Sequence, residues 1–136
     1  MGRRDPLPRE TLVGVQVLVV DDDGEACELL ATILGYCGAL VTTSTSAEQA
    51  VARVTRVVPD IVVCDIVMGD RDGYWLLDAL RRLPGGATLP IVAVTGFDDV
   101  HTAERTLSSG FNGHVRKPID PWELARLVAA LTRGRT

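Results

Sequence analysis

The chain has 136 residues, of which 46% are hydrophobic and only 4% are aromatic, and its formal net charge is -4. This length suits one domain with an aliphatic core of the kind that helices and buried parallel strands share. The mildly acidic charge argues against nucleic acid as the main partner, because neutralising phosphates requires a basic surface.

Residues 1–14 form a polar lead-in or linker that lacks the apolar stretch of a signal peptide. No apolar run in the sequence reaches the roughly 20 residues of a membrane span, so we expect no membrane association. The three cysteines are odd in number and show no CxxC spacing. We interpret them as small core residues in a reducing environment and expect a cytoplasmic protein.

Short aliphatic runs alternate with amphipathic stretches along residues 15–133. In the first half, the pattern predicts a strand at 15–20, a helix at about 24–37, a strand at 40–44, a helix that Ser46 caps and Pro59 ends, and a strand at 60–64. In the second half, it predicts a helix between the 68–73 loop and Pro84, a strand at 91–94, a helix at about 99–109, a strand at 113–116 and a helix capped by Asp120. Such alternation gives a parallel sheet with helices on both faces.

Each helix is expected to turn its apolar residues toward the sheet. For the first helix these residues are Ala26, Leu29, Leu30, Ile33 and Cys37, and for the fourth they are Val100, Ala103 and Leu107.

Polar and charged residues directly follow most of the predicted strands. They are Asp21, Asp22 and Asp23 after the first strand, Asp65 after the third, Thr95 after the fourth and Lys117 after the fifth. In a doubly wound sheet, ligands bind outside the carboxyl ends of the strands. We therefore expect these side chains to converge on one pocket.

Adjacent aspartates at the end of a buried strand repel one another, and desolvating them is costly unless a positive charge lies among them. Asp23 alone could cap the following helix, which leaves the other two aspartates unexplained. Carboxylates suit Mg²⁺, which prefers oxygen ligands together with water and phosphate. Asp65 could act as a nucleophile, and Thr95 and Lys117 could bind phosphoryl oxygens. The set therefore predicts a site that handles a phosphoryl group.

Four motifs lie in register along the chain: VLVVDDD, DIVVCDIVMGDRDGYWLL, PIVAVTG and HVRKPID. In this order and spacing they make the chain similar to the receiver domain of two-component response regulators, over about residues 15–131. The resemblance implies a flavodoxin-like α/β fold, that is, a doubly wound five-stranded parallel sheet in the order 2-1-3-4-5. It also implies a single receiver domain at residues 15–133.

The resemblance further implies a role for each site residue. Asp65 is the expected phosphoacceptor, Thr95 the switch hydroxyl and Lys117 the phosphate-binding lysine. The expected metal ligands are Asp22 and Asp65 directly, Asp21 through a bound water, and the backbone carbonyl of Val67. The expected ion is Mg²⁺, for which Mn²⁺ can substitute. Pro118 is expected to follow a cis peptide bond.

Three positions depart from the family pattern. Gly69 stands where proline is usual, so the 68–73 loop is expected to be more flexible and to order with Mg²⁺ or phosphate. His114 stands where an aromatic switch residue is common, and two interpretations stay open: a structural imidazole, or a switch residue with some pH sensitivity. Val67 is apolar and cannot orient an attacking water, which predicts slow spontaneous hydrolysis of the phosphoryl group.

The resemblance implies that a histidine kinase or a histidine phosphotransfer protein donates a phosphoryl group to Asp65. The face of the predicted 99–109 helix, the 113–116 strand and the last helix would then change its affinity for a downstream partner. Such a domain catalyses only its own phosphorylation and is not a turnover enzyme.

Two other functions fit part of this pattern. A Mg²⁺-dependent phosphohydrolase would need an acid at the position of Val67, and a phosphorylation-independent scaffold would not need the acid, threonine and lysine set. A single-domain regulator, a piece of a hybrid histidine kinase and a homodimer through the last two helices all stay open.

Overall fold

The computed structural model describes residues 9–69, 71–96 and 102–133. Along these residues the elements are β1 (Gln16–Val20), α1 (Gly24–Tyr36), β2 (Leu40–Ser44), α2 (Ala47–Arg56), β3 (Ile61–Asp65), α3 (Gly73–Arg81), β4 (Ile91–Thr95), α4 (Thr102–Ser109), β5 (Gly113–Arg116) and α5 (Pro121–Thr132). The strands pair in parallel in the order β2-β1-β3-β4-β5. This confirms the predicted flavodoxin-like, doubly wound α/β fold.

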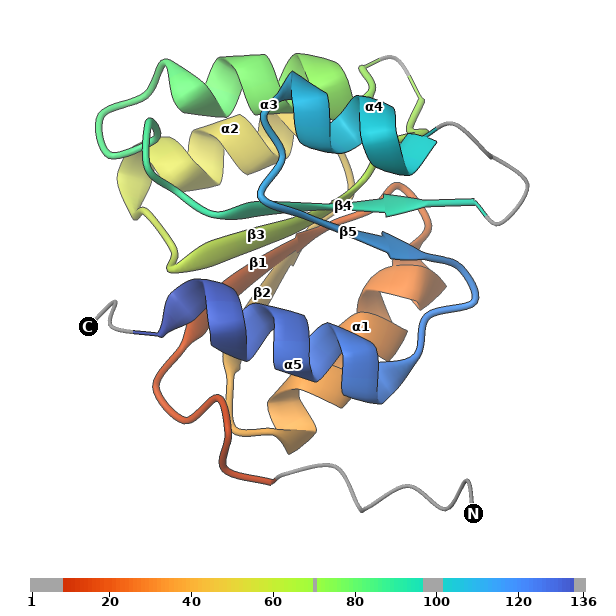
Figure 1. The fold of residues 1–136 in the computed structure, drawn as a ribbon. Coiled ribbons are helices and arrows are strands. Elements are labelled where there is room, and N and C mark those ends of the chain that lie inside the picture. The colour runs from red at the N-terminus through yellow and green to blue at the C-terminus, as the bar shows by residue number, and fades with distance from the viewer. Residues whose placement is uncertain (1–8, 70, 97–101, 134–136) are drawn as a thin grey trace.

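Helices cover both faces of the sheet, with α1 and α5 on one face and α2, α3 and α4 on the other (Figure 1). The central strands β3 and β4 are buried on both faces, which is why they read as continuous aliphatic runs. Alternate side chains of β1 enter the two cores: Val17 and Val19 pack with α1 and α5, and Leu18 and Val20 pack on the opposite side.

The inward face of α1 differs from the predicted one. Cys27, Leu30 and Leu34 are buried, whereas Leu29 is 58% exposed. The inward face of α1 is set by Cys27, Leu30 and Leu34, and a helix turns by about 100° per residue, so Leu29 lies at the margin of this face and points to solvent. The prediction that Leu29 packs inward is therefore wrong, and Leu34 takes part in the core instead.

The inward face of α4 also differs from the prediction. Thr106 is fully buried, whereas Leu107 is 50% exposed. Burial of Thr106 is tolerated because its hydroxyl donates to the Ala103 carbonyl at 3.0 Å. The predicted start of this helix, with Val100, lies outside the described residues.

The predicted helix caps are present. The Ser46 hydroxyl accepts a hydrogen bond from the Gln49 amide, and Asp120 caps α5 with Pro121 in the first turn. The carboxylate of Asp23 accepts from the Glu25 amide and caps α1. Asp23 is thus used by the helix, and the other two aspartates of the run are not.

The packing begins before residue 15. Leu12 is fully buried in the core between α1 and α5, and its amide donates to the Cys37 carbonyl at 2.8 Å. The last residues of the expected lead-in therefore close the base of this core. No helix among the described residues has the length and apolar character needed to cross a membrane.

Arg81, at the end of α3, joins three segments at the edge of the sheet where the strands begin. Its guanidinium donates to the carbonyls of Gly86 and Leu89, which lead into β4. It also donates to the Gly110 carbonyl and to the Asn112 side chain, which lie between α4 and β5. One half-buried guanidinium therefore fixes both connections at the edge opposite the aspartates.

Candidate functional site

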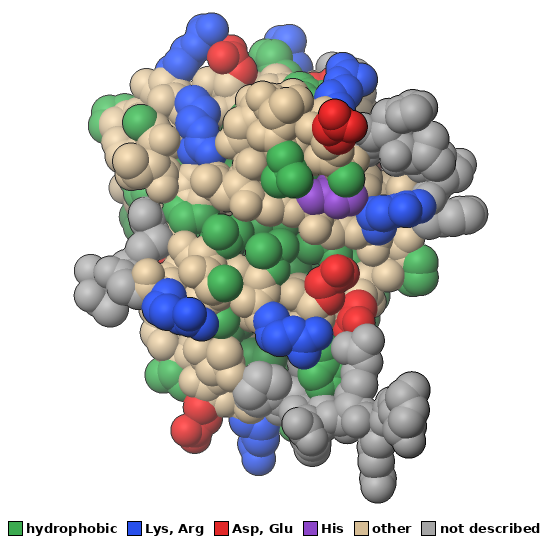
Figure 2. Space-filling view, in the orientation of Figure 1, with side chains coloured by type: hydrophobic (Ala, Val, Ile, Leu, Met, Phe, Trp, Pro, Cys, Tyr) green, Lys and Arg blue, Asp and Glu red, His purple; other side chains and the backbone are tan. Residues whose placement is uncertain are grey.

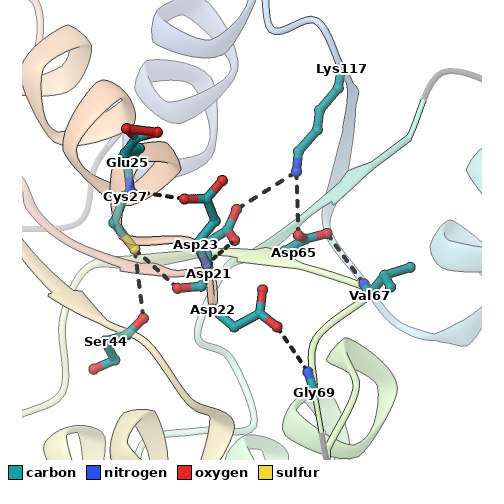
Figure 3. Close-up of polar contacts among 10 residues, drawn as sticks. All are labelled: Asp21, Asp22, Asp23, Glu25, Cys27, Ser44, Asp65, Val67, Gly69 and Lys117. Atoms are coloured by element: carbon teal, nitrogen blue, oxygen red, sulfur yellow. Dashed lines mark hydrogen bonds and ion pairs between the residues drawn. The ribbon is translucent and has the colours of Figure 1, made fainter.

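The sheet brings the predicted site residues to one edge. Asp21 directly follows β1, Asp65 ends β3, Thr95 ends β4 and Lys117 directly follows β5. Because all these strands run in parallel, their carboxyl ends lie on the same side of the molecule. Figure 3 shows Asp21, Asp22, Asp65 and Lys117 facing a common space.

Three carboxylates form a cluster at this edge. Asp21, Asp22 and Asp65 each offer one oxygen, and these oxygens all lie within 4.8 Å of one another. Asp21 and Asp65 are only 2% and 7% exposed, whereas Asp22 is exposed. The pKa of Asp21 is raised, first by burial and then by the charge of Asp65, although the Asp23 amide opposes this. Ionising these buried, neighbouring carboxylates therefore costs free energy, and a bound cation would offset this cost.

Lys117 supplies positive charge to the same cluster. Its Nζ lies 3.3 Å from Oδ2 of Asp65 and 3.7 Å from Oδ2 of Asp21. Burial works against the ammonium, but the two carboxylates outweigh it and raise the pKa of Lys117. The peptide bond between Lys117 and Pro118 is cis, which is the geometry that the resemblance implies.

The donor set of the cluster fits Mg²⁺. Carboxylate oxygens are the hard ligands that this ion prefers, and it keeps several waters or phosphate oxygens besides. The buried carboxylate of Asp21, with its raised pKa, gives an independent reason to expect a cation there. Asp21, Asp22 and Asp65 are the residues that could hold it.

Asp65 is held by two donors. Its Oδ2 accepts from Lys117, and its Oδ1 accepts from the Val67 amide at 3.2 Å. The side chain of Val67 is 69% exposed beside it. A carboxylate fixed in this way, next to a lysine and at the end of a buried strand, can act as a nucleophile toward phosphorus.

Asp22 is tied to the β3–α3 loop. Its Oδ2 accepts a hydrogen bond from the Gly69 amide at 3.0 Å (Figure 3). Proline at position 69 would lack this N–H. The sequence marks Gly69 as a departure from the family pattern, but not as a donor to a residue 47 positions away.

Thr95 is paired with His114 on the neighbouring strand. Thr95 is only 1% exposed, and its Oγ1 lies 2.7 Å from Nε2 of His114. Burial lowers the pKa of His114, Arg116 lowers it further, and Glu123 opposes both. The Thr95 side chain is thus turned toward His114. Among the described contacts, no hydrogen bond joins it to the carboxylate cluster.

Two contacts of the Asp21 backbone could not be predicted from the sequence. The thiol of Cys27, on α1, donates to the Asp21 carbonyl at 3.3 Å, and the Asp21 amide donates to the Ser44 carbonyl at 3.1 Å. These contacts hold the backbone of Asp21 between α1 and β2. An aliphatic helix face with one cysteine gives no indication of this role.

Comparison with known proteins agrees with the fold and identifies the family. Residues 17–129 match the model of the response regulator receiver domain. The chain is 40% identical over 119 residues to an uncharacterized 14.6 kDa protein in the sodA1 3′ region of Leptolyngbya boryana, covering 88% of the chain and 91% of that protein. It is 35% identical over 106 residues to the transcriptional regulatory protein ZraR of Salmonella typhimurium, covering 78% of the chain but only 24% of that relative.

The fold is also similar to that of a solved receiver domain. The signal receiver domain of a signal transduction histidine kinase from Syntrophus aciditrophicus is 29% identical and superimposes with a TM-score of 0.81, covering 90% of the chain and 95% of that domain.

The doubly wound sheet with acids, a threonine and a lysine at its carboxyl edge is the architecture of receiver domains, a family of signalling domains rather than classical enzymes. The chain belongs to the family of response regulator receiver domains of two-component systems. The resemblance drawn from the four motifs is thereby confirmed. Receiver domains typically bind Mg²⁺ through an acidic cluster, and Asp21, Asp22 and Asp65 form such a cluster here.

Proposed function

We propose that the chain accepts a phosphoryl group on Asp65 in two-component signalling. The donor is the phosphohistidine of a partner histidine kinase or histidine phosphotransfer protein. An oxygen of Asp65 forms the new bond to phosphorus as the phosphorus–nitrogen bond of phosphohistidine breaks, and the departing imidazole takes up a proton. The observation that carries the proposal is the position of Asp65, within reach of both Lys117 and the other two carboxylates.

The chain's own residues support such a transfer. The Val67 amide donates to one oxygen of Asp65, and Lys117 neutralises the charge of the other. The ammonium of Lys117 would then bind the oxygens of a phosphoryl group on Asp65. Asp21, Asp22, Asp65 and the Val67 carbonyl would hold Mg²⁺, or Mn²⁺ in its place. When bound, the ion supplies the positive charge that lets an anionic phosphoryl group approach the carboxylates.

The proposed readout is the surface of α4, β5 and α5. The hydrogen bond between Thr95 and His114 links the end of β4 to β5, so a rotation of the Thr95 side chain toward a phosphoryl group would change a contact of β5. On this side of the molecule hydrophobic side chains gather between the two helices, with both basic and acidic side chains around them (Figure 2). Leu107 on α4 is half exposed. A downstream protein whose affinity depends on phosphorylation would bind at this surface.

Two further parts of the proposal concern the extent and setting of the domain. The receiver unit spans residues 15–133, with Leu12 packed beneath it. Cys27, Cys37 and Cys64 are free and buried, which agrees with a reducing cytoplasm.

A phosphohydrolase is disfavoured because Val67 offers no proton carrier beside Asp65.

The direct test is phosphorylation by a small acyl phosphate in the presence of Mg²⁺, followed by mass spectrometry. The wild type should gain the mass of one phosphoryl group, and Asp65→Asn should gain none. Asp78→Asn, on the exposed face of α3, is the matched control and should react like the wild type. Chelation of Mg²⁺ should suppress the reaction. An equal mass gain in Asp65→Asn would place the phosphoacceptor elsewhere.

A further inference from the structure

The switch hydroxyl has a titratable partner in this chain. In the register of β4 and β5, His114 lies opposite Ala93, two residues before Thr95, so both side chains emerge on the same face. The two atoms that meet are Oγ1 of Thr95 and Nε2 of His114, at 2.7 Å. Thr95 is buried, so its hydroxyl depends on protein partners rather than on solvent.

The direction of this hydrogen bond depends on the charge of the ring. A neutral imidazole can accept the Thr95 proton at Nε2 or, as the other tautomer, donate to Oγ1. A protonated imidazole carries hydrogen on both nitrogens and can only donate. Protonation of His114 therefore forces the Thr95 proton away from the ring and leaves it available to another acceptor.

We propose that His114 is a positioning residue for Thr95, and that its protonated form directs the Thr95 hydroxyl proton toward a phosphoryl group on Asp65. This inference rests on the proposed function, because it needs the phosphoryl group as the second acceptor. Since coupling is reciprocal, protonation of His114 favours the switched state, and the switched state favours protonation of His114.

The surroundings of the ring set its resting state. Among the described residues, the charges that act on His114 are Arg116, on the same strand, and Glu123, on α5. Burial and Arg116 lower the pKa of His114 below its ordinary value, so the ring is neutral at neutral pH in the unmodified domain. A neutral ring can hold the Thr95 proton, and acidification below the lowered pKa of His114 releases it. The receiver would then respond to phosphorylation and to pH together.

The experiment is a pH titration of the His114 imidazole by NMR. The chain has two histidines, so the titration uses a His101→Gln background that leaves one imidazole signal. Spectra are recorded with Mg²⁺ alone and with saturating Mg²⁺ and beryllofluoride, which stands in for a phosphoryl group on a carboxylate. The pKa of His114 should rise by roughly 0.7 to 1 unit with beryllofluoride, a five- to tenfold coupling.

Variants of Thr95 separate the hydrogen bond from simple charge attraction. In Thr95→Val, which keeps the shape but lacks the hydroxyl, less than half of the rise should remain, because only the added negative charge still acts on His114. Thr95→Ser should restore the rise. A pKa of His114 that is unchanged with beryllofluoride bound, or an equal rise in Thr95→Val, would overturn the inference and leave the proposed function standing.

Failure of the proposed function has a different signature. If beryllofluoride shifts no backbone amide signals near Asp65, or shifts them equally in Asp65→Asn, the phosphoacceptor assignment falls, and the role of His114 falls with it. The affinity for beryllofluoride gives a second readout: it should tighten as the pH falls in the wild type more than in His114→Phe. Parallel pH profiles of the two proteins would contradict the inference.

Discussion

The metal-free domain should become more stable when Asp65 is replaced by asparagine. At an effective dielectric constant of about 20, two unit charges at the 4.8 Å limit of the cluster repel by about 3.5 kcal/mol. Asp65 makes two such repulsions, with Asp21 and Asp22. The attraction between Nζ of Lys117 and Oδ2 of Asp65, at 3.3 Å, offsets about 5 kcal/mol of this repulsion. Asp65→Asn should therefore raise the free energy of unfolding by about 2 kcal/mol. Exposure of Asp22 and Lys117 to solvent should reduce this gain to about 1 kcal/mol.

Urea unfolding at neutral pH and low ionic strength, with a chelator present, measures this gain. Asp78→Asn is the control: it removes an exposed ion pair with Arg82 and should change stability by less than about 0.5 kcal/mol. With saturating Mg²⁺ the order should reverse, because the wild type gains the free energy of binding. If Asp65→Asn is the less stable protein in the chelator, the repulsion inferred from the cluster is wrong.

Three further predictions concern neighbouring groups. Gly69→Pro removes the amide that holds Asp22 and should weaken Mg²⁺ binding about tenfold in calorimetric titration. Gly69→Ala, whose Cβ would lie 3.9 Å from Oδ2 of Asp22, should bind normally, and equal affinities of the two variants would refute this role. Because the folded-state pKa of Asp21 is raised, its protonated form favours folding, and this contribution is lost as pH rises through that pKa. Asp21→Asn should therefore stabilise the metal-free protein at neutral pH, and a gain that persists below the ordinary aspartate pKa of 3.8 would contradict the assignment. The phosphoryl group on Asp65 should hydrolyse slowly because Val67 cannot orient water, and a half-life of seconds without a phosphatase would exclude this.

The fold was predictable because local signals agree with one another. Aliphatic runs buried on both faces, caps at Ser46 and Asp120, and strand–helix alternation all require the same parallel sheet. The clustering of Asp21, Asp22 and Asp65 followed from the same reasoning, because parallel strands place their carboxyl ends together.

The contacts that were missed depend on side-chain direction and on long-range pairing. The apolar pattern could not distinguish Leu29 from Leu34 as a core residue, because the phase of α1 is set by packing against the sheet. The hydrogen bond from Gly69 to Asp22 and the one between Thr95 and His114 join residues that are remote in sequence. Neither bond follows from periodicity or composition, and each depends on how two loops or strands meet.

The guanidinium of Arg81 has a consequence for how α4 can move. It holds Gly110, directly after α4, and Asn112, directly before β5, at the edge of the sheet remote from the aspartates. The opposite end of α4 lies toward the carboxyl edge (Figure 1). The C-terminal end of α4 is therefore anchored at this edge, and this anchor would act as the pivot if the helix were displaced from the β4 side. Its first turn would travel farthest, and Leu107, close to the pivot, would stay nearly in place.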